Sequence, residues 1–119
     1  MDKKEKIEMI AMVANDVNRA FCEGIGDPVP AAWEEASEEI KESSRNGVAF
    51  VLDNPDVSPE QSHENWMKFK TEHGWKYGPV KDEKKKEHPD LVPYDELPKN
   101  QKAKDFIFRA VVKSMWKGL

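Results

Sequence analysis

Apolar residues recur every three or four positions in four stretches of the chain, which is the pattern of amphipathic helices. The first stretch begins at Lys6 and ends before the Gly24–Pro28 segment. Its apolar stripe consists of Ile7, Ile10, Ala14, Val17 and Phe21, and further apolar positions are Met9, Met12, Val13 and Ala20. This wide surface predicts a helix buried on more than one side, either under the rest of the domain or across a dimer interface. Residues 1–5 are expected to be frayed.

The second stretch predicts one long helix from Pro30 to about Asp53, because the apolar phase continues through Gly47. Proline is favoured in a first helical turn. Glycine inside a helix costs about 1 kcal/mol, so a short strand at 48–52 is the alternative.

The third stretch carries the strongest helix-start signal. Ser58 is a good N-cap, Pro59 fits the first turn, and Gln61 completes a capping box. The helix is expected to run to about His73 and to end at a left-handed Gly74. Its shared face consists of His63, Trp66, Phe69, Lys70 and His73.

Glycine and proline punctuate the chain after this helix. Residues 75–77 are expected to be extended, and Gly78-Pro79 to turn the chain. Asp82 is expected to cap a helical turn over 83–87, and two prolines keep 91–97 irregular. The last helix is predicted over 98–117, with a buried side of Ala103, Phe106, Ile107, Ala110, Val111 and Met115. The fold class is therefore mainly α: a compact domain of four helices with a short extended segment and a proline-rich connection.

Composition and charge narrow the class of protein. A chain of 119 residues with 35% charged residues indicates one soluble domain. No apolar run approaches the ~18 residues of a membrane span, and no signal-peptide core is visible, so a cytoplasmic protein is expected. The single cysteine, Cys22, excludes an intramolecular disulfide and is expected to be a buried, inert thiol.

The charge is unevenly distributed. The net charge is −4, with −9 over residues 1–64 and +5 over residues 65–119. Net acidity argues against general nucleic-acid binding. The basic half indicates either attraction between two halves or two subunits, or a positive pocket for an anionic small molecule.

Signatures of catalysis are absent from the sequence. There is no phosphate-binding loop, no G-x-S-x-G and no H-E-x-x-H. His63 and His73 lie ten residues apart, about 15 Å along a helix, which is too far to share a zinc ion. We therefore expect a non-enzyme with no metal site and no cofactor.

Trp66 is the leading candidate for ligand contact. His63 one turn before it and Lys70 one turn after it are poor neighbours for an apolar core position. An indole flanked by two donors suits stacking on a flat heterocycle, although a core role is the alternative. We interpret Trp75 as a core anchor and Tyr77 as partly lining a pocket, and His88 and Tyr94 as mainly structural.

The sequence from the third helix onward resembles the RyR domain, the repeat found in pairs in ryanodine receptors and alone in bacterial and phage proteins. The matching segments are HENW at 63–66, GWKYGPVKD at 74–82, HPDLVPY at 88–94 and Leu97, followed by a closing helix. The resemblance covers 58–119 closely and 30–54 more loosely. It divides the chain into an N-terminal helix and turn (1–29) and a RyR-type domain (30–119).

The resemblance implies non-catalytic binding of an adenine nucleotide or nucleotide-derived signal, for sensing or sequestration, as in phage–host conflict. The positions that the resemblance carries over are His63 and Trp66, with the adenine stacked on Trp66. Tyr77, Lys70 and Lys81 are expected to contact the sugar or phosphate, together with His63. Lys81 stands where receptor repeats often have arginine, so bidentate phosphate recognition is lost there. Because receptor repeats act in pairs, a homodimer is expected. The alternative is a protein–protein interaction or assembly module, and an enzyme acting on a nucleotide derivative is a weaker third reading.

Overall fold

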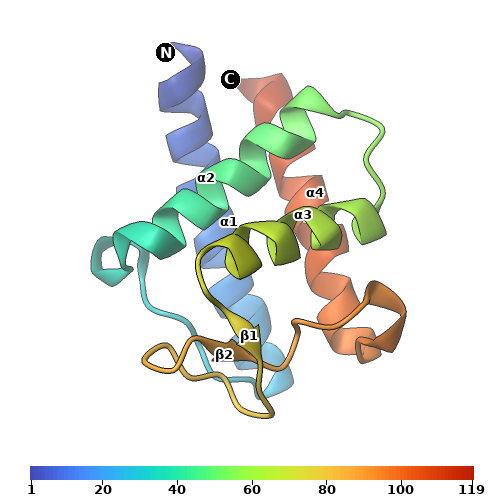
Figure 1. Ribbon diagram of the computed structural model, residues 1–119. Helices are drawn as coiled ribbons and strands as arrows, with labels where there is room; N and C mark the ends of the chain where they lie inside the picture. Colours follow the sequence, from blue (N-terminus) through green and yellow to red (C-terminus); the bar gives the residue numbers. More distant parts are fainter.

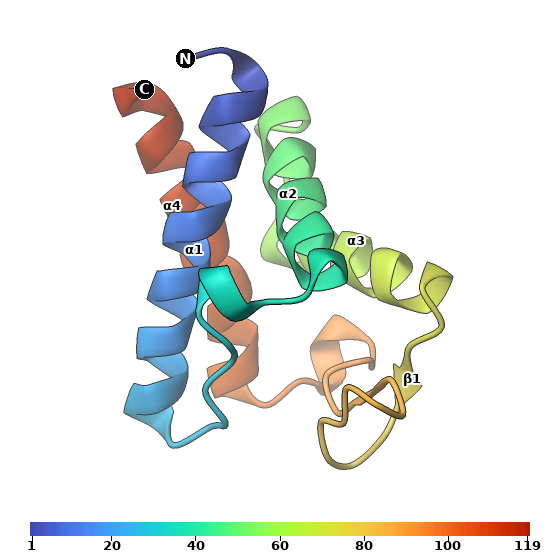
Figure 2. The ribbon, with the colours of Figure 1, turned by 90° about the vertical axis from the view of Figure 1, so that its left-hand side faces the viewer.

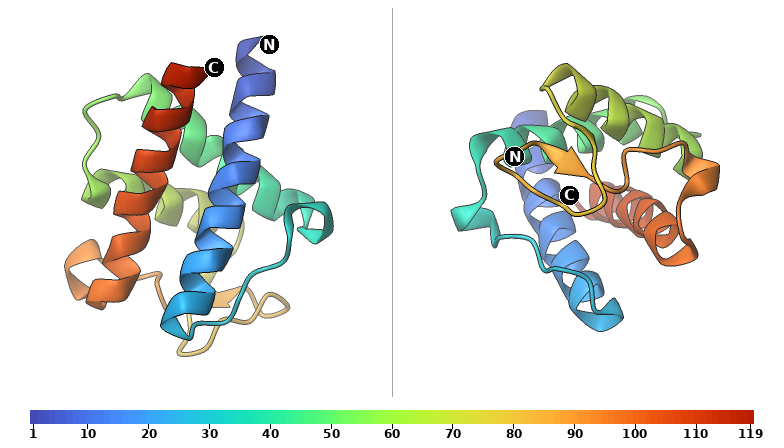
Figure 3. Two further views of the ribbon diagram at one scale, coloured as in Figure 1. Left: turned by 180° about the vertical axis from the view of Figure 1, so that it is seen from behind. Right: turned by 60° about the horizontal axis from the view of Figure 1, so that its bottom comes forward.

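The computed structural model describes residues 1–119 and consists of four helices with a small strand pair at one end (Figure 1). Helix α1 (Lys3–Ile25) and helix α4 (Lys99–Gly118) lie side by side and run in opposite directions, so both termini lie at the same end (Figure 3, left). Helix α2 (Glu38–Asp53) packs on α1, and helix α3 (Pro59–Glu72) packs on α2 and α4 (Figure 2). The predicted mainly α fold with four helices is confirmed.

Helix α1 begins earlier than predicted. The Asp2 side chain accepts a hydrogen bond from the Glu5 N–H, and the Glu5 carboxylate accepts one from the Asp2 N–H. This capping box satisfies N–H groups that the first turn leaves free, so residues 1–5 are not frayed as expected. The helix ends where Gly26 adopts a left-handed conformation with φ 79°.

The predicted start of the second helix at Pro30 is wrong. A 3₁₀ turn, η1 (Trp33–Glu35), comes first, and α2 begins only after Ser37, whose side chain accepts a hydrogen bond from the Ile40 N–H. Serine is a strong N-cap, and it sets the helix start at Glu38, eight residues after Pro30. The predicted continuity through Gly47 is confirmed, and the alternative strand is not formed. A Cβ at Gly47 would lie 3.1 Å from the Phe108 ring, so the glycine allows α4 to pack closely on α2.

Helix α3 follows the sequence prediction closely. Ser58 and Gln61 form the reciprocal capping box, and Pro59 is the first helical residue. The helix stops at Glu72, and Gly74 has φ 87°, as its left-handed role requires.

The chain after α3 forms a two-stranded parallel pair, β1 (Lys76–Tyr77) and β2 (Glu87–His88). Asp82 caps the intervening turn by accepting hydrogen bonds from the Lys84 and Lys85 N–H groups. The expectation that this turn continues through Glu87 is wrong, because Glu87 pairs with Lys76 instead. A Cβ at Gly78 would lie 2.6 Å from the Cβ of Glu87, so the close approach requires glycine.

The connection to α4 contains a 3₁₀ turn, η2 (Tyr94–Glu96), between the two prolines. The buried side of α4 was partly mispredicted, since Phe106 is 56% exposed and Ala110 is also exposed. Phe108, Val112 and Met115 face the core instead. The buried cluster at the centre consists of Ile10, Ala11, Trp33, Val48, Val51, Val57 and Val112. None of the helices combines the length and the apolar character that crossing a lipid bilayer demands.

Candidate functional site

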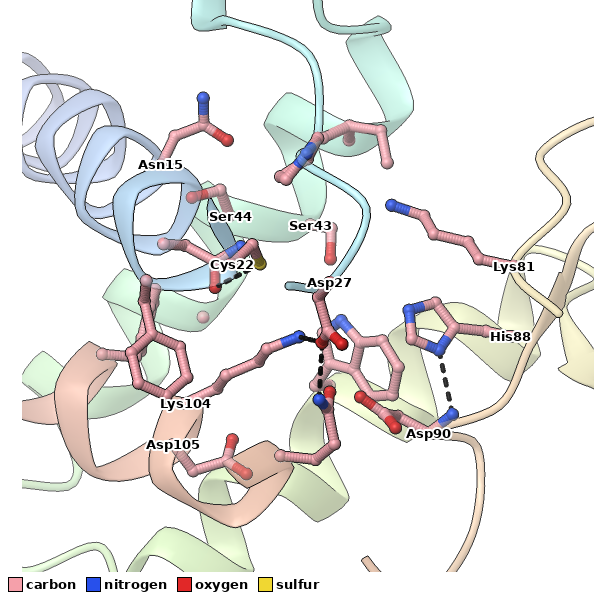
Figure 4. Close-up of a pocket in the computed structure, with 18 of the residues that line it drawn as sticks. Asn15, Cys22, Asp27, Ser43, Ser44, Lys81, His88, Asp90, Lys104 and Asp105 are labelled. Carbon is pink, nitrogen blue, oxygen red and sulfur yellow. Dashed lines mark hydrogen bonds and ion pairs between the residues drawn. The ribbon is translucent and has the colours of Figure 1, made fainter. Parts of the chain in front are cut away.

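A cavity with a volume of about 860 Å³ is lined by residues of all four helices together with segments 79–81 and 88–90 (Figure 4). Its helical lining residues come from the C-terminal part of α1, the N-terminal parts of α2 and α4, and α3. This volume is at the upper end of the range found for small-molecule sites. Its wall combines apolar side chains with several charged ones.

Helix α3 supplies three side chains from successive turns of one face: His63, Trp66 and Lys70. Residues three and four positions apart lie above one another on a helix, so this alignment follows from the spacing. All three belong to the predicted site, and the structure brings them to one wall of the cavity.

His63 is held firmly within that wall. Only 3% of the residue is exposed, its Nε2 lies 2.8 Å from the Val92 carbonyl oxygen, and its ring stacks on Trp66 with 5.5 Å between centroids. Because a carbonyl only accepts hydrogen bonds, Nε2 must carry the proton and donate. His63 therefore fixes the proline-rich segment to α3 and positions the indole.

Trp66 is half-buried and lines the cavity, so its ring is not fully buried in the hydrophobic core. His88 contacts the indole in an edge-on arrangement with 5.0 Å between ring centroids. Together with the His63 stack, this contact fixes the plane of the indole, as a stacking platform requires.

Lys70 is the most unusual group of the site. Only 4% of it is exposed, and no carboxylate or carbonyl of the chain accepts a hydrogen bond from its amine. Its Nζ lies 4.7 Å from the centre of the Trp75 ring. Burial, together with the nearby charge of Lys81, lowers the pKa of Lys70 to about 8, so the amine still carries its proton at neutral pH.

Trp75 behaves as the predicted core anchor. It is 5% exposed, and its indole N–H donates to Glu39 over 2.9 Å, while Lys86 also donates to Glu39 over 3.0 Å. These hydrogen bonds lower the pKa of Glu39. The Glu39 carboxylate is therefore bound to Trp75 and Lys86 and accepts no hydrogen bond from Lys70, although its charge and that of Glu83 partly offset the effect of burial on the pKa of Lys70.

Lys81 and His88 enter the cavity from the strand-bearing segment. Lys81 makes no ion pair, and Figure 4 shows its amine pointing into the cavity. The Asp90 N–H donates to His88 Nδ1 over 3.0 Å, so the proton of the neutral ring is on Nε2, which points inward (Figure 4). Burial and the charge of Lys81 lower the pKa of His88 to about 3, so the ring stays neutral and donates from Nε2.

Three aspartates complete the polar lining. Asp27 accepts hydrogen bonds from Gln101 over 2.6 Å and from Lys104 over 3.2 Å, and these contacts lower its pKa. Asp90 and Asp105 have no such donors, and burial raises both pKa values, that of Asp105 to about 7. Figure 4 shows Asp105 and Lys81 on opposite sides of the cavity.

The arrangement therefore offers an aromatic platform, N–H donors that lack acceptors, and carboxyls that lack donors. These groups are suited to non-covalent recognition of a polar, anionic molecule with a flat ring. No group of three or more His, Cys, Asp or Glu side chains has the geometry of a metal site.

Comparison with known protein families matches residues 55–117 to the RyR domain. The chain belongs to the RyR domain family. The match begins just before α3 and ends near the end of α4, so it contains the α3 wall, the strand pair and the carboxyls at 90 and 105. Helices α1 and α2 lie outside the matched residues but supply the opposite side of the cavity.

Within this RyR domain, one predicted site residue lies elsewhere. Tyr77 is 57% exposed and does not line the cavity. The strand pairing that buries Trp75 and Gly78 directs Tyr77 to the outer surface, so the pocket role expected of it is wrong.

Six charged residues of the RyR-domain cavity were not predicted from the sequence: Asp27, Glu35, Glu83, Asp90, Lys104 and Asp105. Asp27 stood out only as part of the segment that ends the first helix, and Asp90 only as part of the HPDLVPY match. Lys104 and Asp105 could have been predicted from the sequence, because they lie about one turn before Phe108 on the side of α4 that faces inward. Charged residues on an otherwise apolar helix face indicate a polar cavity.

Proposed function

We propose that this RyR domain is a non-catalytic receptor for an anionic small molecule with a flat heterocycle, such as an adenine nucleotide or a nucleotide-derived signal. The heterocycle stacks on Trp66, and Lys70, Lys81 and His88 Nε2–H bind the phosphate. The observation that carries this proposal is the buried amine of Lys70, which lines the cavity without an acceptor.

The Lys70 side chain is largely withdrawn from water and its amine donates to no oxygen of the chain, so a ligand oxygen in the cavity would supply an acceptor that the protein does not. Lys81 adds a second cation, and its charge contributes to the lowered pKa of Lys70. An anion placed between them relieves that repulsion. Nothing in the lining offers an activated nucleophile, which supports binding without chemistry.

Isothermal titration calorimetry against ATP, ADP, AMP and cyclic ADP-ribose tests the proposal. Binding of at least one compound, with a matching rise in Tm, is expected. Lys81→Gln should weaken binding at least tenfold, because a charged hydrogen bond contributes about 1.5–3 kcal/mol. Lys84→Gln removes the same charge from an exposed position of the same loop and should leave affinity unchanged.

Heat from none of these compounds, together with an unchanged Tm, would favour the protein–protein interaction module instead. Recovery of chemically unaltered ligand after long incubation is expected, and conversion to a product would support the enzyme reading.

The proposal includes a homodimer in which the outer faces of α1 and α4 pair with those of a second copy. Met12 is 39% exposed on α1 beside the acidic Asp16, and Phe106 is 56% exposed on α4, whose outer face carries Lys113 and Lys117. A twofold arrangement would set Asp16 of one copy against Lys113 and Lys117 of the other. Light scattering after gel filtration should give twice the monomer mass, and Phe106→Glu should give the monomer.

The biological role that we infer is sensing or sequestering the ligand in the cytoplasm, in a bacterium or in phage–host conflict. This inference rests on the family rather than on the site. Ligand affinity compared with the concentration of that compound in infected and uninfected cells would test it.

A further inference from the structure

Two carboxyls of the cavity have no assigned role in anion binding: Asp105 lies opposite Lys81, and Asp90 lies beside His88 (Figure 4). Asp105 contributes from α4 and Asp90 from the segment after β2. The Asp105 side chain is 17% exposed, and no N–H or O–H group of the chain donates to either carboxyl. Both residues line the cavity, so a ligand there that carries N–H or O–H groups can donate to these oxygens.

The carboxyls of Asp90 and Asp105 differ from the third aspartate of the cavity in having no hydrogen-bond donor. Asp27 lines the same cavity, and its Oδ2 accepts hydrogen bonds from both Gln101 and Lys104. The nearest nitrogen to Asp105 is His63 Nδ1, at 3.8 Å from Oδ2, which is beyond hydrogen-bond distance. In the neutral ring that nitrogen carries a lone pair, because the proton is on Nε2. His63 therefore does not satisfy Asp105.

The contacts of Trp66 place the aromatic platform between the two ends of the cavity. The ring of His88, on the Lys81 side, is nearly perpendicular to the indole at 5.0 Å between centroids, and the ring of His63, next to Asp105, stacks with it at 5.5 Å. A ring lying on Trp66 with its anionic group at Lys81 would direct its far side toward Asp105.

We infer that Asp90 and Asp105 form a second subsite, which accepts hydrogen bonds from amino or hydroxyl groups of the ligand remote from its anionic group. This inference rests on the proposed function, since the anion orients the ligand. The buried and unpartnered Lys70 in the same cavity is the independent sign that a ligand completes the site. The donors are either an exocyclic amino group of the base or the hydroxyls of the sugar.

Three probes distinguish these sources: AMP, purine riboside 5′-monophosphate, which lacks the amino group, and 2′,3′-dideoxy-AMP, which lacks the hydroxyls. We expect the wild-type protein to bind one of the two analogues about tenfold more weakly than AMP in calorimetry. In Asp105→Asn and Asp90→Asn, that discrimination should fall to less than threefold, while binding of inorganic pyrophosphate stays unchanged.

Asp95→Asn is the matched control, because Asp95 is exposed and does not line the cavity. It should keep the wild-type discrimination, and circular dichroism should show that all variants are folded. Equal wild-type affinity for all three probes, with Lys81→Gln still weakening each, would refute the second subsite and leave the proposed function standing. Discrimination that survives both aspartate variants would also refute it. Absence of binding by any probe would overturn both.

Discussion

His63 donates from Nε2 to the Val92 carbonyl, while its Nδ1 lies 3.8 Å from the Asp105 carboxylate. Two acceptors thus face each other across this gap whenever the ring is neutral and the carboxyl is ionised. Burial, with a contribution from Asp90, raises the pKa of Asp105 to about 7. Protonation of the Asp105 carboxyl removes this unfavourable contact between two acceptors, so the stability of the site depends on pH.

The first prediction concerns Asp105→Asn and stability. The folded-state pKa of Asp105 is raised above its usual value of 3.8, so the folded state binds more protons between pH 4 and 7. The stability that goes with the protonated Asp105 carboxyl is therefore fully present below pH 4, and it is lost as pH rises through 7. Asp105→Asn should therefore raise the free energy of unfolding at pH 8 by about 1–3 kcal/mol and flatten the profile between pH 4 and 7.

Urea denaturation at several pH values measures this effect. Asp95→Asn, at an exposed position, should leave the profile unchanged. A profile for Asp105→Asn that is parallel to the wild-type profile would contradict the raised pKa.

The second prediction concerns Lys70. Its pKa is lowered to about 8 by burial, so the folded state gives up this proton more readily than the unfolded chain does. Lys70→Met keeps the apolar stem beside Trp75 and removes the buried charge, so stability at pH 7 should increase by about 1–3 kcal/mol while anion binding is lost. In the wild-type protein, anion affinity should fall as pH rises through 8.

Thermal unfolding and calorimetry on the same samples check both parts. Lys68→Met, at an exposed position on the same helix, should change neither quantity appreciably. Destabilisation by Lys70→Met would show that the amine has a partner within the protein.

The third prediction concerns the start of α3. Ser58→Ala removes the side chain that accepts the Gln61 N–H and should lower the free energy of unfolding by about 1 kcal/mol. Ser114→Ala, at an exposed position inside α4, should have an effect below about 0.5 kcal/mol. Chemical denaturation distinguishes the two values, and equal effects would contradict the capping role.

The fourth prediction concerns the strand pair. A Cβ at Gly78 would overlap Glu87, so Gly78→Ala should push the strands apart, destabilise the domain by about 2 kcal/mol or more and weaken anion binding through Lys81. Gly24→Ala is the control, since nothing lies within 4 Å of its Cβ, and it should be neutral or slightly stabilising. Wild-type anion affinity in Gly78→Ala would show that the strand pair does not position Lys81.

Local signals in the sequence accounted for much of the fold. Ser58, Gln61 and Gly74 define α3 through backbone hydrogen bonds within a few residues, so they are readable without the tertiary structure. The start of α2 was misread because Pro30 and Ser37 are both acceptable starts, and only Ser37 is used. The phase of α4 was misread because Phe106 and Phe108 are equally apolar, and packing against Gly47 decides between them.

The site was only partly readable for the same reason. His63, Trp66 and Lys70 share a helix face, so their grouping follows from spacing. Asp27, Asp90 and Asp105 come from three separate segments that meet only in the folded chain. Tyr77 was misplaced because a two-residue strand gives no periodicity from which to infer its direction.

The most direct test follows the indole N–H signals of the four tryptophans in ¹⁵N–¹H NMR spectra while ATP is added. A ring stacked on Trp66 should shift its signal strongly and saturably, with little change at Trp116, which lies at the far end of α4. Saturable binding of ATP with an unmoved Trp66 signal, or with shifts confined to Trp116, would contradict the assignment of the cavity as the ligand site.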